Sequence, residues 1–156
     1  QGLVEGRPGN RLQALLSVCN VAAGCGSGVL AVRLDGFIAI EPFAPRFPFE
    51  TWILPKSHES DYSKLSDSMA LDLAGIVKIT LAKLRVALAD PPYNYVVHTD
   101  AFSNSGKEYY HWHMEVIPKL TKIAGFEWGS GFYSNPTAPE DAARDMRDVR
   151  VPVTER

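Results

Sequence analysis

The pattern of apolar and polar positions predicts short strands in the first half of the chain. The stretches 29–34 (VLAVRL) and 37–42 (FIAIEP) flank Asp35 and Gly36, a pair that favours a two-residue hairpin turn between antiparallel strands. The stretch 49–55 (FETWILP) lies between two prolines and predicts a third strand. The first half of the chain therefore carries the pattern of a small antiparallel sheet.

A long amphipathic helix is predicted after these strands. Ser66 is the expected N-cap, and the Pro91–Pro92 pair terminates the segment. Between them apolar residues recur at the i, i+3, i+4 spacing of one helix face. These residues are Met69, Leu73, Ile76, Val77, Leu81, Leu84 and Leu88.

Two more strands follow the helix, at residues 93–98 (YNYVVH) and 111–118 (HWHMEVIP), separated by a polar loop. Thr137 and Glu140 have the spacing of a capping box, which predicts a short helix from about 138 to 148. Strands, one long helix and a return to strands are typical of an α+β domain. We expect a twisted antiparallel sheet with the long helix packed on one face.

Length and composition favour one globular domain. The chain has 156 residues, of which 1–28 are expected to form a poorly structured lead-in and 29–156 the domain. The net charge is -2 and Lys and Arg do not cluster, which argues against nucleic acid as the main partner. No apolar run approaches the roughly 20 residues that span a bilayer, and no export signal opens the chain, so we expect a cytoplasmic protein. Cys19 and Cys25 lack a metal-ligand spacing and are expected to be inert thiols.

The histidines of the last predicted strand are the strongest candidates for chemistry. Side chains alternate along a strand, so His111, His113 and Glu115 should share one face. The opposite face carries Trp112, Met114 and Val116, which should pack against the long helix. His98 ends the neighbouring strand and approaches the same face if the two strands pair antiparallel. Nitrogen and oxygen ligands of this kind suit zinc or ferrous iron, whereas three solvated histidines on a polar sheet face are the alternative.

A second possibility is nucleophilic catalysis by His113. An imidazole can attack phosphorus, form a phosphoramidate and release the leaving group. Such a role needs phosphate-binding donors, which the glycine-rich stretch 125–136 could supply through its backbone N–H groups. In the same stretch, Glu127 could accept hydrogen bonds from sugar hydroxyls beside an apolar platform of Phe126 and Trp128.

Three stretches of the sequence resemble the C-terminal half of the galactose-1-phosphate uridylyltransferase family, within the histidine-triad superfamily. They are FIAIEPFAPRFPFETWILPKSHESDYSKL, PPYNYVVHTDAF and YYHWHMEVIPKLTKIAGFEWGSGFYSNPTAPEDAA. The resemblance covers roughly residues 29–148, with the elements in the family's order and spacing. Proteins of this family are built from two similar halves, each an antiparallel sheet with a long helix, and they usually form dimers. The resemblance implies that this chain is one such half.

The resemblance also assigns roles to individual residues. It implies that His98, His113 and Glu115 are ligands of a zinc or iron ion, with His111 as a further candidate. Glu127 matches a sugar-contacting glutamate, and Asn135 lies near another such contact. The implied substrates are a nucleoside diphosphate sugar and a sugar 1-phosphate, exchanged by double displacement through a uridylyl-histidine.

One departure from the family pattern leaves three functions open. The family's nucleophilic histidine lies in a His-Pro-His-type motif of the N-terminal half, and no such motif occurs in this chain. The chain is then expected to be the C-terminal part of a nucleotidyltransferase, as a homodimer or paired with an N-terminal half. A stand-alone nucleotide hydrolase or phosphorylase that uses His113 is the enzymatic alternative. A non-catalytic, metal-stabilised binding or dimerisation domain is the other.

Overall fold

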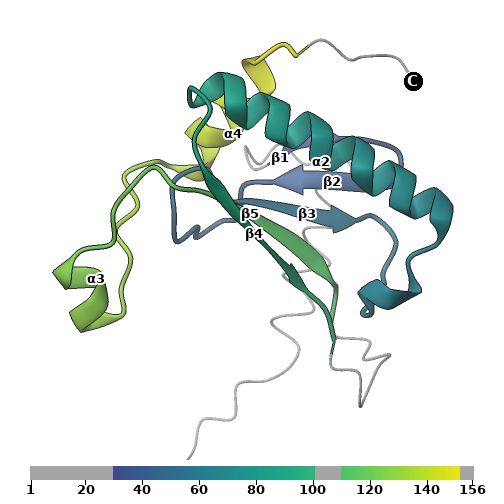
Figure 1. Ribbon diagram of the computed structural model, residues 1–156, viewed down its shortest axis with the longest axis horizontal. Helices are drawn as coiled ribbons and strands as arrows, with labels where there is room; N and C mark the ends of the chain where they lie inside the picture. Colours follow the sequence, from purple (N-terminus) through teal and green to yellow (C-terminus); the bar gives the residue numbers. More distant parts are fainter. Residues whose placement is uncertain (1–29, 101–109, 152–156) are drawn as a thin grey trace, which may run out of the picture.

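The computed structural model describes residues 30–100 and 110–151, and within these ranges five strands form one antiparallel sheet (Figure 1). The strands are β1 (Leu30–Arg33), β2 (Phe37–Ile40), β3 (Thr51–Pro55), β4 (Tyr93–His98) and β5 (His113–Pro118). The helices are η1 (Tyr62–Lys64), α2 (Asp67–Ala87), α3 (Gly125–Ser130) and α4 (Pro139–Asp148). The strand order is β1-β2-β3-β5-β4, so β5 lies inside the sheet and β4 forms one edge.

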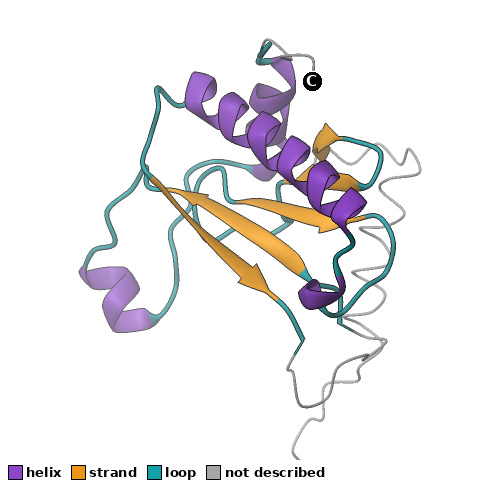
Figure 2. Ribbon diagram, turned by 45° about the vertical axis from the view of Figure 1, so that its right-hand side comes forward, coloured by secondary structure: helices purple, strands orange, loops and turns teal. Residues whose placement is uncertain are grey.

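The long helix α2 covers one face of the sheet, as Figures 1 and 2 show. Ser66 caps it as predicted, because its hydroxyl accepts the N–H of Met69 at 3.3 Å. On the buried side of α2, Ile76 is 0% exposed and belongs to the same apolar cluster as Phe37 of β2 and Trp112. The predicted α+β arrangement with one helix-covered sheet face is therefore confirmed.

Three local expectations differ from the structure. The strand β5 begins at His113, so His111 precedes it and does not follow its alternation. The N-cap of α4 is Ala138 and not Thr137, because Pro139 occupies the first helical position; the N–H of Thr137 instead donates to Oδ1 of Asn135. A short helix, α3, forms within the stretch that was expected to be loop.

Some expectations lie outside the described residues, namely the lead-in at 1–28, with Cys19 and Cys25, and the polar loop between the last two strands. Among the described residues, no helix combines the length and the apolar character that crossing a bilayer requires.

Candidate functional site

His98, His113 and Glu115 come together on the sheet face opposite α2. The register of β4 and β5 places His98 directly across from His113, and Glu115 lies two residues further along β5. Nε2 of His98 is 3.3 Å from Oε2 of Glu115, and Nε2 of His113 is 3.9 Å from Oε1. One ligand atom from each residue lies within 4.8 Å of the others. We call these three residues the histidine–glutamate cluster.

The aromatic ring of Trp52 completes a stack with the two imidazoles. The ring of His113 lies between Trp52, at a centroid distance of 4.7 Å, and His98, at 4.8 Å. The two interplanar angles are 26° and 21°, so the three rings are close to parallel. Trp52 faces Glu115 across β3 and β5, which puts its side chain on the same sheet face. Packing between two rings restricts the orientation of the His113 imidazole.

The tautomer of His113 follows from its hydrogen bond. Its Nδ1 lies 3.2 Å from the carbonyl oxygen of His111. Because a carbonyl oxygen can only accept a hydrogen bond, Nδ1 of His113 carries the proton. The lone pair is then on Nε2, the nitrogen that faces Glu115. Burial lowers the pKa of the His113 imidazole, and the hydrogen bond to the His111 carbonyl opposes this change. A neutral imidazole with a free Nε2 can bind a metal ion or act as a nucleophile.

His111 lies apart from the cluster. Its Nε2 donates to the carbonyl oxygen of Pro55 at 2.8 Å, and its Nδ1 is 3.3 Å from Nδ1 of His58. The side chain is buried, and this burial lowers its pKa. The alternation that was expected to place His111 beside His113 does not extend to it, because His111 precedes β5 and its side chain contacts the end of β3. The geometry gives His111 a structural hydrogen bond in place of a ligand position.

Arg46 joins the cluster from the loop between β2 and β3. Its Nη2 lies 2.7 Å from Oε2 of Glu115, whose side chain is 7% exposed. Neither Arg46 nor Trp52 stood out in the sequence. The alternation of β3 could have placed Trp52 on this face, whereas Arg46 lies in an irregular loop where no periodicity indicates direction.

The residues of the cluster fit a metal ion. Two imidazoles and one carboxylate are donors that zinc and iron accept. Nε2 of His98 is buried, and its 3.3 Å contact with Oε2 of Glu115 does not have hydrogen-bond geometry. A buried nitrogen without a hydrogen bond is unusual, and coordination of a metal ion would satisfy it.

Glu127 lies on a separate part of the molecule, whereas Asn135 contacts the loop that carries Arg46. The helix α3, which carries Glu127, follows the end of β5 remote from His113 and projects away from the sheet (Figures 1 and 2). Oε2 of Glu127 accepts the N–H of Ala124 at 3.0 Å. Nδ2 of Asn135 donates to the carbonyl oxygen of Pro45 at 3.3 Å. Within this chain, neither residue joins the histidine–glutamate cluster.

Comparison with known sequences identifies enzymes named for nucleotide sugars or sugar phosphates as relatives. No family model matches the chain. It is 45% identical over 117 residues to ADP-glucose phosphorylase of Arabidopsis thaliana, an alignment that covers 74% of this chain and 33% of that protein. It is 29% identical over 144 residues to galactose-1-phosphate uridylyltransferase of Thermotoga maritima, covering 87% of this chain and 45% of that protein. The chain thus spans less than half the length of both relatives.

Solved structures agree with the sequence matches. The crystal structure of the Arabidopsis thaliana ADP-glucose phosphorylase with bound ADP-glucose superposes with a TM-score of 0.81 at 35% identity, covering 92% of this chain and 47% of that one. A zinc-bound histidine triad family protein from Mycobacterium smegmatis superposes with a TM-score of 0.59 at 19% identity, covering 84% and 89%. At this lower identity the likeness concerns the fold alone.

The sheet, its covering helix and the paired histidines define a histidine-triad-like α+β domain. The chain is a homologue of galactose-1-phosphate uridylyltransferase-like proteins and shares its fold with histidine triad family proteins, which confirms the resemblance found in its sequence.

Proposed function

We propose that this chain is a uridylyltransferase-like nucleotidyltransferase domain, acting on a nucleoside diphosphate sugar and a sugar 1-phosphate. The observation that carries the proposal is the convergence of His98, His113 and Glu115 on one sheet face. The relatives with an ADP-glucose or uridylyltransferase activity support the substrate class. The nucleophilic histidine would come from outside this chain, since the chain has no His-Pro-His motif.

The reaction we propose is a double displacement at the α-phosphorus. In the first step the histidine outside this chain forms a bond to phosphorus, and the bond from phosphorus to the sugar 1-phosphate breaks. In the second step an incoming sugar 1-phosphate takes the nucleotidyl group and releases the histidine. This chain would contribute sugar-binding groups at Glu127 and Asn135, with the exposed rings of Phe126 and Trp128 beside Glu127 as an apolar platform.

His98, His113 and Glu115 would hold zinc or iron. A bound ion would supply positive charge and a cross-link between β4 and β5, a structural role. The rings of Trp52 and His98 already restrict the His113 imidazole, so the donors need little reorganisation on binding. The imidazole of His111 is engaged with Pro55 and would not take part.

The hydrogen bond of His113 supports one alternative. Because its Nδ1 proton is held by the His111 carbonyl, its Nε2 is oriented for attack on phosphorus. In this alternative the chain is a stand-alone nucleotide hydrolase or phosphorylase. The same nitrogen cannot be metal ligand and nucleophile at once, so the two functions make opposite demands on His113.

Metal content and turnover together separate a metal-holding domain from the stand-alone hydrolase or phosphorylase. The purified chain should contain about one zinc or iron ion per chain by mass spectrometry, and H98N, H113N and E115Q should lose it. The matched control H111N should retain it. The chain alone should not release glucose 1-phosphate from ADP-glucose or UDP-glucose. Turnover of either compound, or of an adenosine phosphoramidate, that H113N abolishes would support the hydrolase alternative and contradict our proposal.

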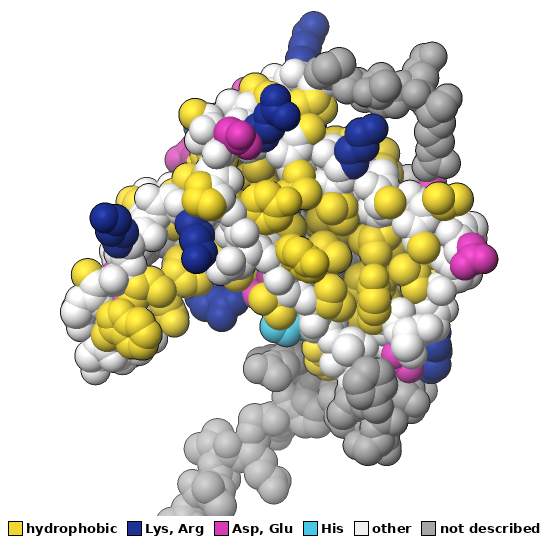
Figure 3. Space-filling model, in the orientation of Figure 1, with side chains coloured by type: hydrophobic (Ala, Val, Ile, Leu, Met, Phe, Trp, Pro, Cys, Tyr) yellow, Lys and Arg dark blue, Asp and Glu magenta, His cyan; other side chains and the backbone are white. Residues whose placement is uncertain are grey.

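We also propose that β4 and α2 pair with a second domain of the same fold. Tyr93 and Tyr95 of the edge strand β4 are 46% and 64% exposed. Figure 3 shows an extended apolar surface over this side of the molecule. Two grooves of about 350 and 390 Å³ run between α2 and β4, and Leu81 and Tyr93 line both. An exposed, apolar edge strand is a site for strand pairing with another domain.

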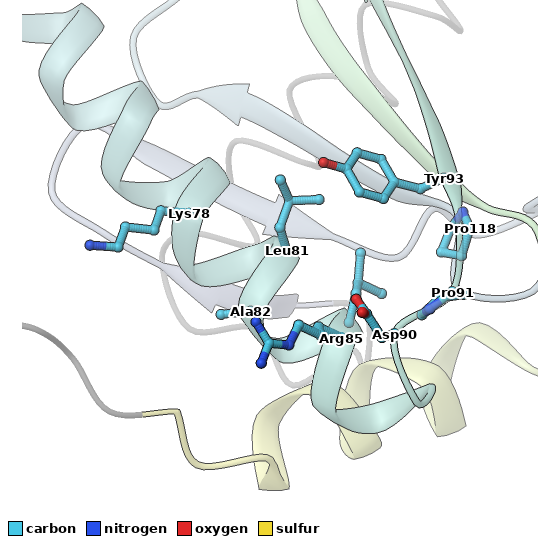
Figure 4. A pocket seen from close by; sticks show the side chains of 9 residues that line it. Lys78, Leu81, Ala82, Arg85, Asp90, Pro91, Tyr93 and Pro118 are labelled. Carbon is cyan, nitrogen blue, oxygen red and sulfur yellow. The ribbon is translucent and has the colours of Figure 1, made fainter.

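The first groove carries charges of both signs at its rim, with Lys78 and Arg85 from α2 and Asp90 from the following turn (Figure 4). Such a surface can be self-complementary across a two-fold axis. We therefore expect the isolated chain to form a homodimer, and Y95R, which puts a charge on the pairing edge, to be a monomer by light scattering. A monomeric unchanged chain at about 100 µM would overturn the homodimer.

A further inference from the structure

A cation belonging to the chain itself already contacts the histidine–glutamate cluster. Nη2 of Arg46 lies 2.7 Å from Oε2 of Glu115, and this carboxylate is almost fully buried. We propose that Arg46 is the internal counter-ion of the cluster, which holds Glu115 in place without a metal ion and lowers the affinity of the cluster for divalent cations. This inference rests on the metal site proposed above.

The local structure directs Arg46 to this position. Oε2 of Glu50 accepts the backbone N–H of Arg46 at 2.8 Å and that of Phe47 at 3.2 Å. Oε1 of Glu50 accepts the indole N–H of Trp52 at 3.1 Å. Glu50 is 1% exposed, so the loop before β3 is held by a buried acceptor that also contacts the aromatic stack.

The position of Glu115 explains why a counter-ion is needed. A buried carboxylate without a positive partner strongly disfavours the folded state. The cluster offers two imidazoles, with Nε2 of His98 at 3.3 Å and Nε2 of His113 at 3.9 Å from the carboxylate, but an imidazole is a counter-ion only when it is protonated. The guanidinium of Arg46 supplies a permanent positive charge. Its side chain is 48% exposed, so it can keep part of its hydration while it neutralises the carboxylate.

The same contact opposes metal binding. A divalent ion on Glu115 would share one carboxylate with Arg46, and two cations around one carboxylate repel each other across a few ångströms of partly buried protein. The ion must also compete with the guanidinium for Oε2. Loss of the positive charge should therefore raise the affinity for zinc by about tenfold or more. A purely structural role for Arg46 predicts the opposite, since loss of a positioning contact would weaken binding.

The test is a zinc titration of chelator-treated protein in competition with a coloured metal indicator. We expect R46Q to bind zinc at least about tenfold more tightly than the unchanged chain, and R46K, which keeps the charge, to stay within about threefold. The control is R144Q, since Arg144 forms an ion pair of the same 2.7 Å length with Asp141 on the exposed surface of α4. R144Q should bind zinc like the unchanged chain.

A second readout follows the metal-free state. Without zinc, R46Q should melt several degrees below the unchanged chain because Glu115, and Glu50 at 3.7 Å from Nε of Arg46, lose their counter-charge, and zinc should restore the part of the loss that belongs to Glu115. An R46Q chain that folds only with zinc also supports the proposal. Zinc affinity of R46Q equal to or below that of the unchanged chain overturns it.

The two proposals fail in different ways. If H113N and E115Q bind zinc as the unchanged chain does, the metal site itself is wrong. If these two variants lose zinc while R46Q gains no affinity, the site is right and the role of Arg46 is wrong.

Discussion

The buried carboxyl group of Glu41 makes the stability of this protein depend on pH. Glu41 follows β2 and is 0% exposed. The hydroxyl of Thr51 donates to its Oε1 at 2.8 Å, whereas its Oε2 has no hydrogen-bond partner among the described residues. Burial raises the pKa of Glu41 from 4.5 to about 8; the Thr51 hydrogen bond opposes the rise, and the Glu50 carboxylate adds to it.

The direction of the effect follows from the proton balance. Below pH 4.5 both the folded and the unfolded chain hold the proton, so Glu41 has no effect on stability there. As the pH rises to about 8, the unfolded chain releases the proton while the folded chain retains it, and the free energy of unfolding falls. One pKa unit corresponds to about 1.4 kcal/mol, so the full loss is about 5 kcal/mol above pH 8.

The substitution E41Q should remove this loss, because glutamine is neutral at every pH and has nearly the same shape. We expect E41Q and the unchanged chain to be equally stable near pH 4.5. The difference in favour of E41Q should grow by about 1.4 kcal/mol per pH unit and reach about 5 kcal/mol near pH 8. Urea denaturation followed by tryptophan fluorescence between about pH 5 and 8.5 measures this difference.

The control is E140Q, which changes an exposed glutamate in the first turn of α4 and should shift stability by less than about 0.5 kcal/mol. A stability difference between E41Q and the unchanged chain that does not vary with pH would refute the reasoning, since Glu41 would then be ionised in the folded protein. So would an E41Q chain that is less stable near pH 8.

Three further predictions concern packing and hydrogen bonds. Ile76→Ala, at a position of α2 that is 0% exposed, should lower the free energy of unfolding by about 3 kcal/mol, whereas Leu71→Ala, 63% exposed on the same helix, should change it by less than about 0.5 kcal/mol in the same urea experiment. His111→Phe should lower the free energy of unfolding by about 1–3 kcal/mol, and with it the melting temperature, because the Pro55 carbonyl loses its donor. The zinc affinity of this variant should be unchanged, as expected if His111 is not a metal ligand. Lys83→Met should destabilise the chain by about 1 kcal/mol, with α4 exchanging its amide hydrogens faster, because the Lys83 amine donates to the Met146 carbonyl at 2.7 Å near the end of α4. An unaltered exchange rate in α4 would contradict that role of Lys83.

The sequence carried the elements that depend on local chemistry. The helix α2 was predictable because its cap at Ser66, its apolar stripe and its terminating prolines all lie within one segment. The strand β4 was predicted at its observed bounds, residues 93–98. The predicted N-cap at Thr137 was wrong because the capping preference of Thr137 competed with the preference of Pro139 for the first helical position. Pro139 took that position, which makes Ala138 the N-cap.

The candidate site was predictable only in part. Alternation along β5 placed His113 and Glu115 on one face, and the assumption of antiparallel pairing added His98. The direction of the His111 side chain was not predictable, because it depends on whether β5 begins before or after this residue. In the structure β5 begins at His113, and Nε2 of His111 donates to the carbonyl oxygen of Pro55, a residue 56 positions away.

The sequence by itself determined the long helix, the strands apart from the start of β5, and the shared face of His113 and Glu115, because each depends on periodicity and neighbouring residues. Only the tertiary structure placed Arg46 on Glu115, across 69 positions of chain, and Trp52 on His113. The buried acceptor Glu50 directs the Arg46 loop, and the β3–β5 register brings Trp52 to the cluster. Both contacts join residues far apart in the chain, and periodicity within one segment does not show which distant segment will pair with it.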